Sequence, residues 1–160
     1  MMKLCCEVLA ALKGKTLATA ESCTGGGIGA ALTAVPGSSA VYRGGIISYT
    51  NEVKHKLLHV DEGVLKTCGA VSAPVAEAMA VGARRALEAE VAVSVTGLAG
   101  PGGDDYGNPV GTVFIGYSDA DETVSERFLF TGTREEIRRA AAEKALEIVL
   151  AHQAKPLASE

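Results

Sequence analysis

The sequence predicts an α/β fold, a three-layer α/β/α sandwich around a mixed, mainly parallel sheet. Short apolar segments alternate with segments whose apolar residues recur every three or four positions. Two of the short segments end in glycine-rich stretches, and two others are separated only by a polar turn, which predicts a hairpin. In such a sheet, ligands bind beyond the carboxyl ends of the strands.

The first half of the chain predicts three helices and two strands. A helix is expected over residues 2–13, because Leu4, Val8 and Leu12 share one face. A buried strand over residues 17–21 leads through a turn at 22–27 into a helix over 28–35, which Pro36 ends. A strand over 42–50 follows, and Asn51 is expected to cap a helix over 52–59.

The second half predicts three helices and three strands. A short helix is expected over residues 61–68 and a longer one from Ser72 to Glu88. A strand over 91–96 runs into a glycine-rich stretch at 96–103, and strands over 110–117 and 123–130 form the hairpin. Thr133 and Glu136 fit a capping box that opens a helix to about residue 151. We expect one domain over residues 1–152 and a disordered tail over 153–160.

Composition narrows the class of protein. The 160 residues suit one domain, and the net charge of -4, with 15 scattered lysines and arginines, argues against nucleic acid as a partner. No apolar run is long enough to span a membrane, and the amino-terminal segment is too polar for a signal peptide. The four cysteines form no C-x-x-C pair, which is typical of free thiols in a reducing compartment. A cytoplasmic protein is therefore expected.

The turn at residues 22–27 is the main candidate site. A strand-to-helix turn presents backbone N–H groups that favour an anion, and Ser22 stands there as a candidate nucleophile. Lys54 is the candidate base if burial lowers its pKa. From spacing alone, the favoured interpretation is plainer: a solvated Lys54 and a Ser22 that caps the helix. Cys23 is a second candidate nucleophile, because a helix N-terminus would lower its pKa, and it ranks behind Ser22.

Three other patterns are weaker. His55 and His59 have the spacing of a metal-binding pair but lack a third ligand of recognisable spacing. Residues 25–30 match the dinucleotide-binding glycine pattern only loosely, since glycine runs match it by chance. Arg138 has the planar fork that binds phosphate or carboxylate, although an exposed ion pair with Glu135 or Glu143 is the ordinary alternative.

Five blocks of the sequence, in order, resemble the CinA C-terminal domain family. They cover most of the chain from residue 18 to residue 139: Ala20-Glu21-Ser22-Cys23-Thr24-Gly25-Gly26, Ser48-Tyr49-Thr50-Asn51-Glu52-Val53-Lys54, Gly69-Ala70-Val71-Ser72, Thr96-Gly97-Leu98-Ala99-Gly100-Pro101-Gly102-Gly103 and Pro109-Val110-Gly111-Thr112-Val113. The resemblance implies a three-layer α/β/α fold, in agreement with the prediction from periodicity.

The resemblance also implies an activity, nicotinamide-nucleotide amidase, which converts nicotinamide mononucleotide to nicotinate mononucleotide and ammonia in pyridine nucleotide salvage. It implies a serine/lysine hydrolase without metal or other cofactor, with Ser22 as nucleophile, Lys54 as general base and Tyr49 beside them. The substrate, a small-molecule nucleotide, would be bound by a larger set: Glu21, Thr24, Gly25, Gly26, Asn51, Thr96, Gly97, Gly100 and Arg138.

Two other functions compete with the amidase. The runner-up is a non-catalytic nucleotide-binding module of the competence- and damage-associated type, in which Lys54 would be a charged phosphate ligand rather than a base. A dinucleotide oxidoreductase is a third option. Asn108 stands where the family usually has a lysine. Many members carry a second domain ahead of this one, so a stand-alone amidase is expected here, and homo-oligomers are compatible with a small domain of this kind.

Overall fold

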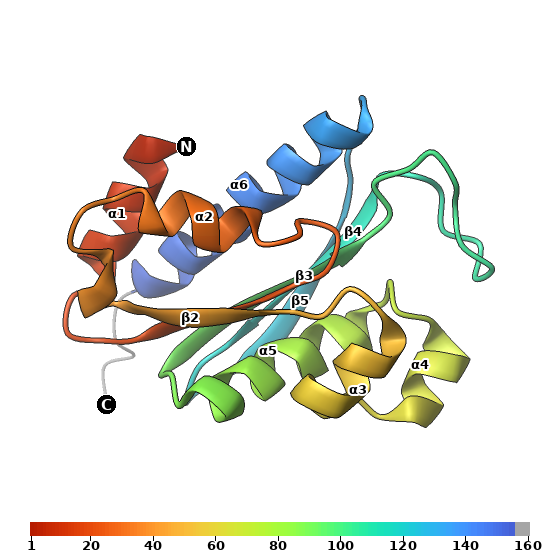
Figure 1. Ribbon diagram of the computed structural model, residues 1–160, viewed down its shortest axis with the longest axis horizontal. Helices are drawn as coiled ribbons and strands as arrows, with labels where there is room; N and C mark the ends of the chain where they lie inside the picture. The colour runs from red at the N-terminus through yellow and green to blue at the C-terminus, as the bar shows by residue number, and fades with distance from the viewer. Residues whose placement is uncertain (156–160) are drawn as a thin grey trace.

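The computed structural model describes residues 1–155 and confirms the three-layer arrangement (Figure 1). The middle layer is one five-stranded sheet in the order β2-β1-β3-β4-β5. Its strands are β1 (Leu17–Glu21), β2 (Tyr42–Ile47), β3 (Val91–Gly97), β4 (Thr112–Ser118) and β5 (Thr123–Leu129). The pairs β1–β2 and β1–β3 are parallel, whereas β4 is antiparallel to both of its neighbours. Thus β4 alone runs against the other four strands, as the predicted hairpin requires.

Helices cover both faces of this sheet (Figure 1). One face carries α1 (Met2–Ala11), α2 (Gly27–Thr33) and α6 (Arg134–Gln153), and the other carries α3 (Asn51–Leu58), α4 (Glu62–Cys68) and α5 (Ala73–Leu87). A short 3₁₀ helix, η1 (Ser38–Ala40), leads into β2. The connection from β1 to β2 therefore crosses one face through α2, and the connection from β2 to β3 crosses the other through α3, α4 and α5.

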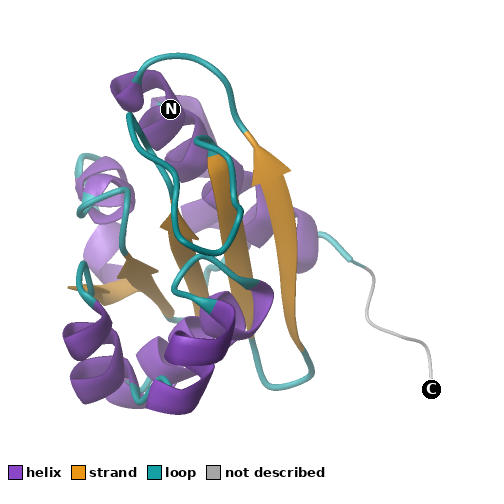
Figure 2. Ribbon diagram, turned by 90° about the vertical axis from the view of Figure 1, so that its right-hand side faces the viewer, coloured by secondary structure: helices purple, strands orange, loops and turns teal. Residues whose placement is uncertain are grey.

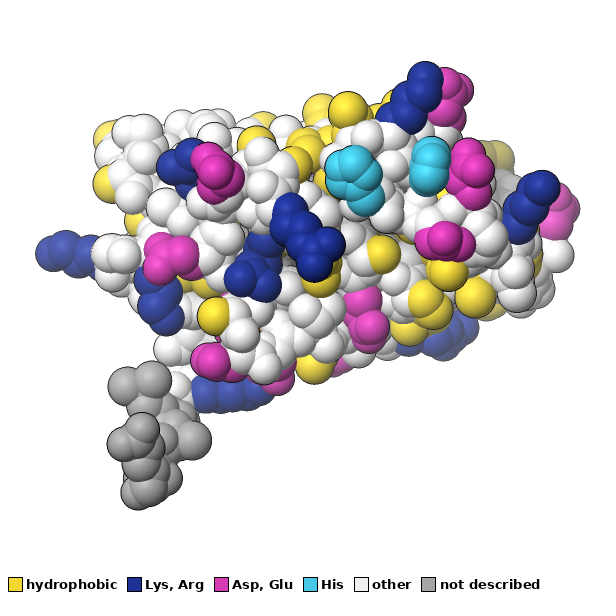
Figure 3. Space-filling model, turned by 90° about the horizontal axis from the view of Figure 1, so that it is seen from below, with side chains coloured by type: hydrophobic (Ala, Val, Ile, Leu, Met, Phe, Trp, Pro, Cys, Tyr) yellow, Lys and Arg dark blue, Asp and Glu magenta, His cyan; other side chains and the backbone are white. Residues whose placement is uncertain are grey.

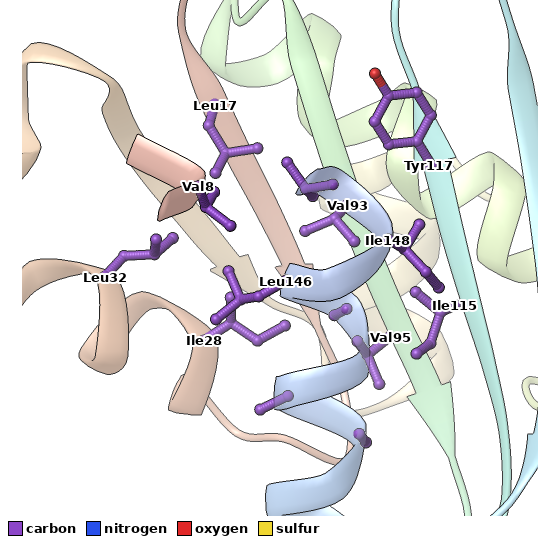
Figure 4. Packing of buried hydrophobic residues seen from close by; sticks show 14 of the residues in the cluster. Val8, Leu17, Ile28, Leu32, Val93, Val95, Ile115, Tyr117, Leu146 and Ile148 are labelled. Carbon is purple, nitrogen blue, oxygen red and sulfur yellow. The ribbon is translucent and has the colours of Figure 1, made fainter. Parts of the chain in front are cut away.

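Each face has its own apolar core. Figure 4 shows side chains of α2 and α6, such as Ile28 and Leu146, packed on β-strand residues such as Val93 and Val95. A second cluster, which includes Leu58 and Met79, fills the space under α3 and α5. Each fully buried aliphatic side chain contributes about 1.5–3 kcal/mol. Packing from both sides holds the sheet, and with it the strand ends that carry the candidate site.

One predicted helix cap is confirmed and one is corrected, and the structure adds a third cap that the sequence analysis did not single out. Asp61 caps α4, with its carboxylate accepting the N–H of Val64 at 2.9 Å, and Thr133 with Glu136 forms the predicted capping box. For α3, however, the cap is Thr50, whose hydroxyl accepts the N–H of Val53 at 3.3 Å, and not Asn51. Asn51 is the first helical residue, so the helix begins one residue earlier than predicted.

Element ends differ from prediction by a few residues. β2 ends at Ile47 rather than at residue 50, since the chain turns there into α3. At the other end of the chain, α6 continues through Gln153, whose side-chain amide donates to the hydroxyl of Tyr117 at 2.8 Å. Gln153 is thus helical and not part of the predicted tail. Residues 156–160, where the rest of that tail was expected, lie outside the described residues.

A tight helix crossing positions α3, the helix of Lys54. A Cβ atom added at Gly82 of α5 would lie 2.2 Å from the carbonyl oxygen of Leu58, the last residue of α3. We expect Gly82→Ala to lower the free energy of unfolding by about 1–3 kcal/mol, because the overpacking outweighs the gain in helix propensity. Chemical denaturation measures this. Gly27→Ala is the matched control, since its Cβ would meet no atom within 4 Å; equal losses in both variants would contradict the prediction.

The face formed by α3, α4 and α5 carries acidic and basic side chains in alternation (Figure 3). Lys56 pairs with Glu52 at 2.8 Å, one helical turn apart on α3. This face therefore offers no continuous basic surface of the kind that binds a nucleic-acid backbone. Within residues 1–155, none of the helices combines the length and the apolar character needed to cross a membrane.

Candidate functional site

The candidate site lies at the edge of the sheet where β1, β2 and β3 end. Figure 2 looks onto this edge, where the loops that leave the strands cross in front of the sheet. Glu21 pairs with Ile47, so the residues that follow, Ser22 and Ser48, are neighbours, and the N–H of Ser48 donates to the carbonyl of Glu21 at 2.9 Å. The next helices, α2 and α3, leave toward opposite faces. This divergence opens the crevice in which α/β sheets bind ligands.

Ser22 and Lys54 meet in this crevice. The amine of Lys54 lies 3.0 Å from the hydroxyl of Ser22 and donates to the carbonyl of Ser48 at 2.7 Å. Lys54 is only 1% exposed and Ser22 only 7%. The plainer interpretation, a solvated lysine and a helix-capping serine, is therefore wrong: Lys54 is buried, and the residue before α2 is Gly26, in the left-handed conformation.

Burial changes the chemistry of this lysine. Desolvation lowers the pKa of Lys54 from its ordinary value to about 8, and a small opposing effect comes from the thiol of Cys23. Near neutral pH an appreciable fraction of the amine is then neutral and able to accept a proton from Ser22. A hydroxyl in contact with such an amine has the arrangement that serine/lysine hydrolases need.

Cys23 does not share this activation. Its side chain is buried in the apolar core under α2 and α6, and desolvation raises the pKa of the thiol to about 11. The expected lowering by the helix N-terminus is therefore wrong, because burial outweighs it. The thiol is protonated at neutral pH, which leaves Ser22 as the candidate nucleophile of this turn.

Glu21 and Thr24 hold the turn together instead of facing the crevice. The Glu21 carboxylate accepts the hydroxyl of Thr24 at 2.7 Å and the backbone N–H groups of Ile28 and Gly29 at 2.9 and 3.1 Å. It thus occupies the N-terminus of α2, where the sequence placed a ligand anion. Neither residue lines the cleft described below, so their expected contact with substrate has no support in the geometry.

Arg138 braces the same turn from the other side. Its guanidinium donates to the carbonyls of Cys23 at 2.9 Å and Thr24 at 3.3 Å, and it lies against Gly25. The ion pair considered as the alternative is not formed within the described part of the chain. Gly25, Gly26 and Arg138, all expected to bind substrate, do not line the cleft described below.

A cleft of about 300 Å³ opens in front of the pair. Seven of the residues expected from the sequence line it: Ser22, Tyr49, Asn51, Lys54, Thr96, Gly97 and Gly100. Thr96 also holds two lining segments of the cleft together, since its hydroxyl donates to the carbonyl of Ala70 at 2.8 Å. The lining residues that the sequence did not single out include Arg134, one helical turn before Arg138. In the sequence, Arg134 is only a charged residue inside the predicted capping box, and nothing in that pattern indicates a place in the cleft.

Asn108, which replaces the usual lysine of the resembled family, serves the loop between β3 and β4. Its side-chain amide donates to the carboxylate of Asp104 at 2.8 Å and to the carbonyl of Val71 at 3.2 Å. Its side chain shapes this loop and does not line the cleft.

The two histidines of α3 do not form a metal-binding pair. The ring of His55 contacts the carbonyl of Val60 at 2.8 Å, and His59 lies past the end of the helix in the left-handed conformation. Among residues 1–155, no group of three or more His, Cys, Asp or Glu side chains is placed to hold a metal ion.

Comparison with known proteins gives a consistent result. The sequence profile of the CinA C-terminal domain matches residues 2–152. A CinA-like protein of Parasynechococcus marenigrum is 55% identical over 125 residues, which are 76% of this chain and 30% of that protein. A CinA-like protein of Synechocystis is 48% identical over 138 residues, 84% of this chain and 33% of that protein. The chain thus spans about a third of the length of these curated relatives.

Solved structures of similar length share the whole fold. The competence damage-inducible protein A of Klebsiella pneumoniae superposes with a TM-score of 0.94 at 34% identity and covers 98% of both chains. A competence/damage inducible protein of Agrobacterium tumefaciens reaches 0.90 at 40% identity and covers 94% of this chain and 93% of its own.

Proposed function

Because this chain belongs to the CinA C-terminal domain family, we propose that it is a nicotinamide-nucleotide amidase that hydrolyses nicotinamide mononucleotide to nicotinate mononucleotide and ammonia. One observation carries the proposal. The amine of Lys54, with its pKa lowered to about 8, lies 3.0 Å from the hydroxyl of Ser22 in an open cleft. A lysine that only bound phosphate would need to stay charged, whereas burial lowers the pKa of Lys54.

The first half of the proposed reaction is acyl transfer to the enzyme. Neutral Lys54 takes the proton of the Ser22 hydroxyl while the oxygen attacks the carboxamide carbon of the substrate. The carbonyl oxygen becomes an oxyanion, which the backbone N–H groups of the turn after Ser22 would stabilise. Protonated Lys54 then gives its proton to the nitrogen as the carbon–nitrogen bond breaks, so ammonia leaves and an ester to Ser22 remains.

The second half returns the enzyme to its starting state. Water enters the place of ammonia and gives a proton to Lys54 as its oxygen attacks the ester carbon. When the carbon–oxygen bond to Ser22 breaks, the serine oxygen recovers that proton and the acid product is released. Tyr49 and Asn51, which line the cleft beside the pair, would orient the pyridine ring.

The decisive experiment is a direct assay of both products. Purified protein incubated with nicotinamide mononucleotide is expected to release ammonia and nicotinate mononucleotide in equal amounts. Calorimetric titration with the same nucleotide runs in parallel. Binding without ammonia release would reject the amidase and favour the non-catalytic nucleotide-binding module.

The rate should depend on pH through Lys54. Because the neutral amine is the active form and its pKa in the folded protein is about 8, kcat/KM is expected to rise about tenfold per pH unit below 8 and to level off above it. Initial rates between pH 6 and pH 10 measure this profile. A rate that falls as the pH rises through 8 would mean that the protonated amine is the active form.

A further inference from the structure

Arg134 closes one end of the cleft. It is the first residue of α6, and its guanidinium donates to the carbonyl of Gly100, in the loop after β3, and to the hydroxyl of Tyr49, in the loop after β2, at 3.2 Å. Three segments that are distant in the sequence therefore meet at this side chain. The Tyr49 and Arg134 side chains are both exposed, so a ligand in the cleft can reach them.

The charge of Arg134 is not compensated by its partners. Both contacts are neutral groups, and within residues 1–155 it forms no ion pair with a carboxylate. The other cation of the cleft is Lys54, which is buried and has a lowered pKa. The guanidinium of Arg138 donates hydrogen bonds to the carbonyls of Cys23 and Thr24. Arg134 is thus the permanent positive charge of this cleft, and its planar fork retains donors for an anion.

A second cavity adjoins the cleft. It has a volume of about 390 Å³, shares Asn51 with the cleft, and is lined by Glu62, by Lys66 and by Glu52, whose carboxylate is paired with Lys56. A phosphate with a charge near -2 is disfavoured beside carboxylates and favoured beside a guanidinium. The end of the cleft beside Arg134 is therefore the favoured place for the phosphate of a ligand that has an amide at one end and a phosphate at the other.

We propose that Arg134 binds the phosphate of the nucleotide while the carboxamide lies at Ser22, and that this contact selects the nucleotide over the corresponding nucleoside. The inference rests on the proposed function for the identity of the ligand. It replaces Arg138, which the sequence favoured for this role. The contacts to Gly100 and Tyr49 hold the guanidinium in place from two sides, so little side-chain freedom is lost when the phosphate arrives.

Binding measurements test this without relying on turnover. Calorimetric titrations use the Ser22→Ala protein with nicotinamide mononucleotide and with nicotinamide riboside, which lacks the phosphate. Adding Arg134→Gln is expected to weaken binding of the mononucleotide by about 10- to 100-fold, the usual loss of a charged hydrogen-bonding contact, and to leave the riboside within about twofold. The affinity of Arg134→Lys for the mononucleotide should lie between those of the protein with Arg134 and of Arg134→Gln. Arg139→Ala, an exposed arginine of the same helix outside the cleft, is the matched control.

The outcomes separate the two proposals. Equal weakening of both ligands would show that Arg134 only holds the loops together, and an unchanged mononucleotide affinity, or no preference for the mononucleotide before the substitution, would equally overturn the inference. If Arg134→Gln weakens binding of the mononucleotide only, but the unmodified protein releases no ammonia, the phosphate site is supported and the amidase is rejected. If ammonia is released and Arg134→Gln changes the affinity for both ligands equally, the amidase is supported and the phosphate site is rejected.

Discussion

Replacing Lys54 with methionine is expected to lower kcat/KM for ammonia release from nicotinamide mononucleotide by about 10³-fold or more, because the serine then has no base within hydrogen-bonding distance. Ser22→Ala should cause a loss of the same order, since the two groups act as one unit. The double variant should be no worse than either single variant. Product formation followed over hours under single-turnover conditions measures rates this low.

Lys54→Met should also change how the free energy of unfolding depends on pH. The unfolded chain keeps Lys54 protonated up to its ordinary pKa of 10.5, whereas the folded protein loses that proton at about 8. Between these two values the unfolded state binds more protons at Lys54, so this residue should contribute about 3 kcal/mol more to the free energy of unfolding at high pH than at pH 7. Lys54→Met should lack this rise. The raised pKa of Cys23 acts in the opposite direction in both proteins, so the contribution of Lys54 is the difference between them. Denaturation curves at pH 7 and pH 10.5 give the difference, and parallel behaviour of the two proteins would mean that Lys54 is not desolvated as the geometry indicates.

Replacing Glu21 with alanine is expected to lower the free energy of unfolding by about 3–5 kcal/mol. The carboxylate is 2% exposed and accepts three hydrogen bonds, two of them from the first turn of α2. Its removal leaves buried N–H donors without acceptors and a cavity between β1 and α2. Glu21→Gln should lose less, because one acceptor oxygen remains.

Glu7→Ala is the control for this experiment. Glu7 is a partly exposed carboxylate whose ion pair with Lys3 spans 3.9 Å on the surface of α1, so its loss should stay within about 0.5 kcal/mol. If Glu21→Ala instead kept full stability and raised only KM, the carboxylate would be a substrate ligand, as the sequence first indicated.

Much of the fold could be predicted because its signals are local. Glycines, prolines and capping residues mark where the elements end, and the alternation of the two apolar periods fixes the layered class. Residues on the cleft side of Ser22 were predictable for a related reason: strand ends gather at one edge of the sheet, so Tyr49, Lys54 and Thr96 had to lie near one another. The burial of Lys54 was not predictable from spacing, since it depends on how α3 packs against α5.

The expected site residues that do not line the cleft share one physical origin. Glu21, Thr24 and Arg138 stand beside Ser22 in the sequence pattern or carry the chemistry expected of a ligand, but their partners are the backbone groups of the turn itself. The direction in which α2 and α6 approach the turn decides which neighbours each of these side chains contacts. Arg134 was overlooked for the same reason, because only the packed structure brings the start of α6 across the ends of two strands.

The central position of β1 also determines when the site forms during folding. β1 pairs with β2, which follows it closely in the chain, and with β3, which is synthesised only after α3, α4 and α5. The N–H of Ser22 is held by the carbonyl of Val95 on β3, at 3.0 Å. An emerging chain that has not yet completed β3 therefore contains Ser22 and Lys54 but lacks the strand that holds the backbone of Ser22. Loop closure over this long separation comes late, so the contact between the two side chains should form only in a nearly complete domain.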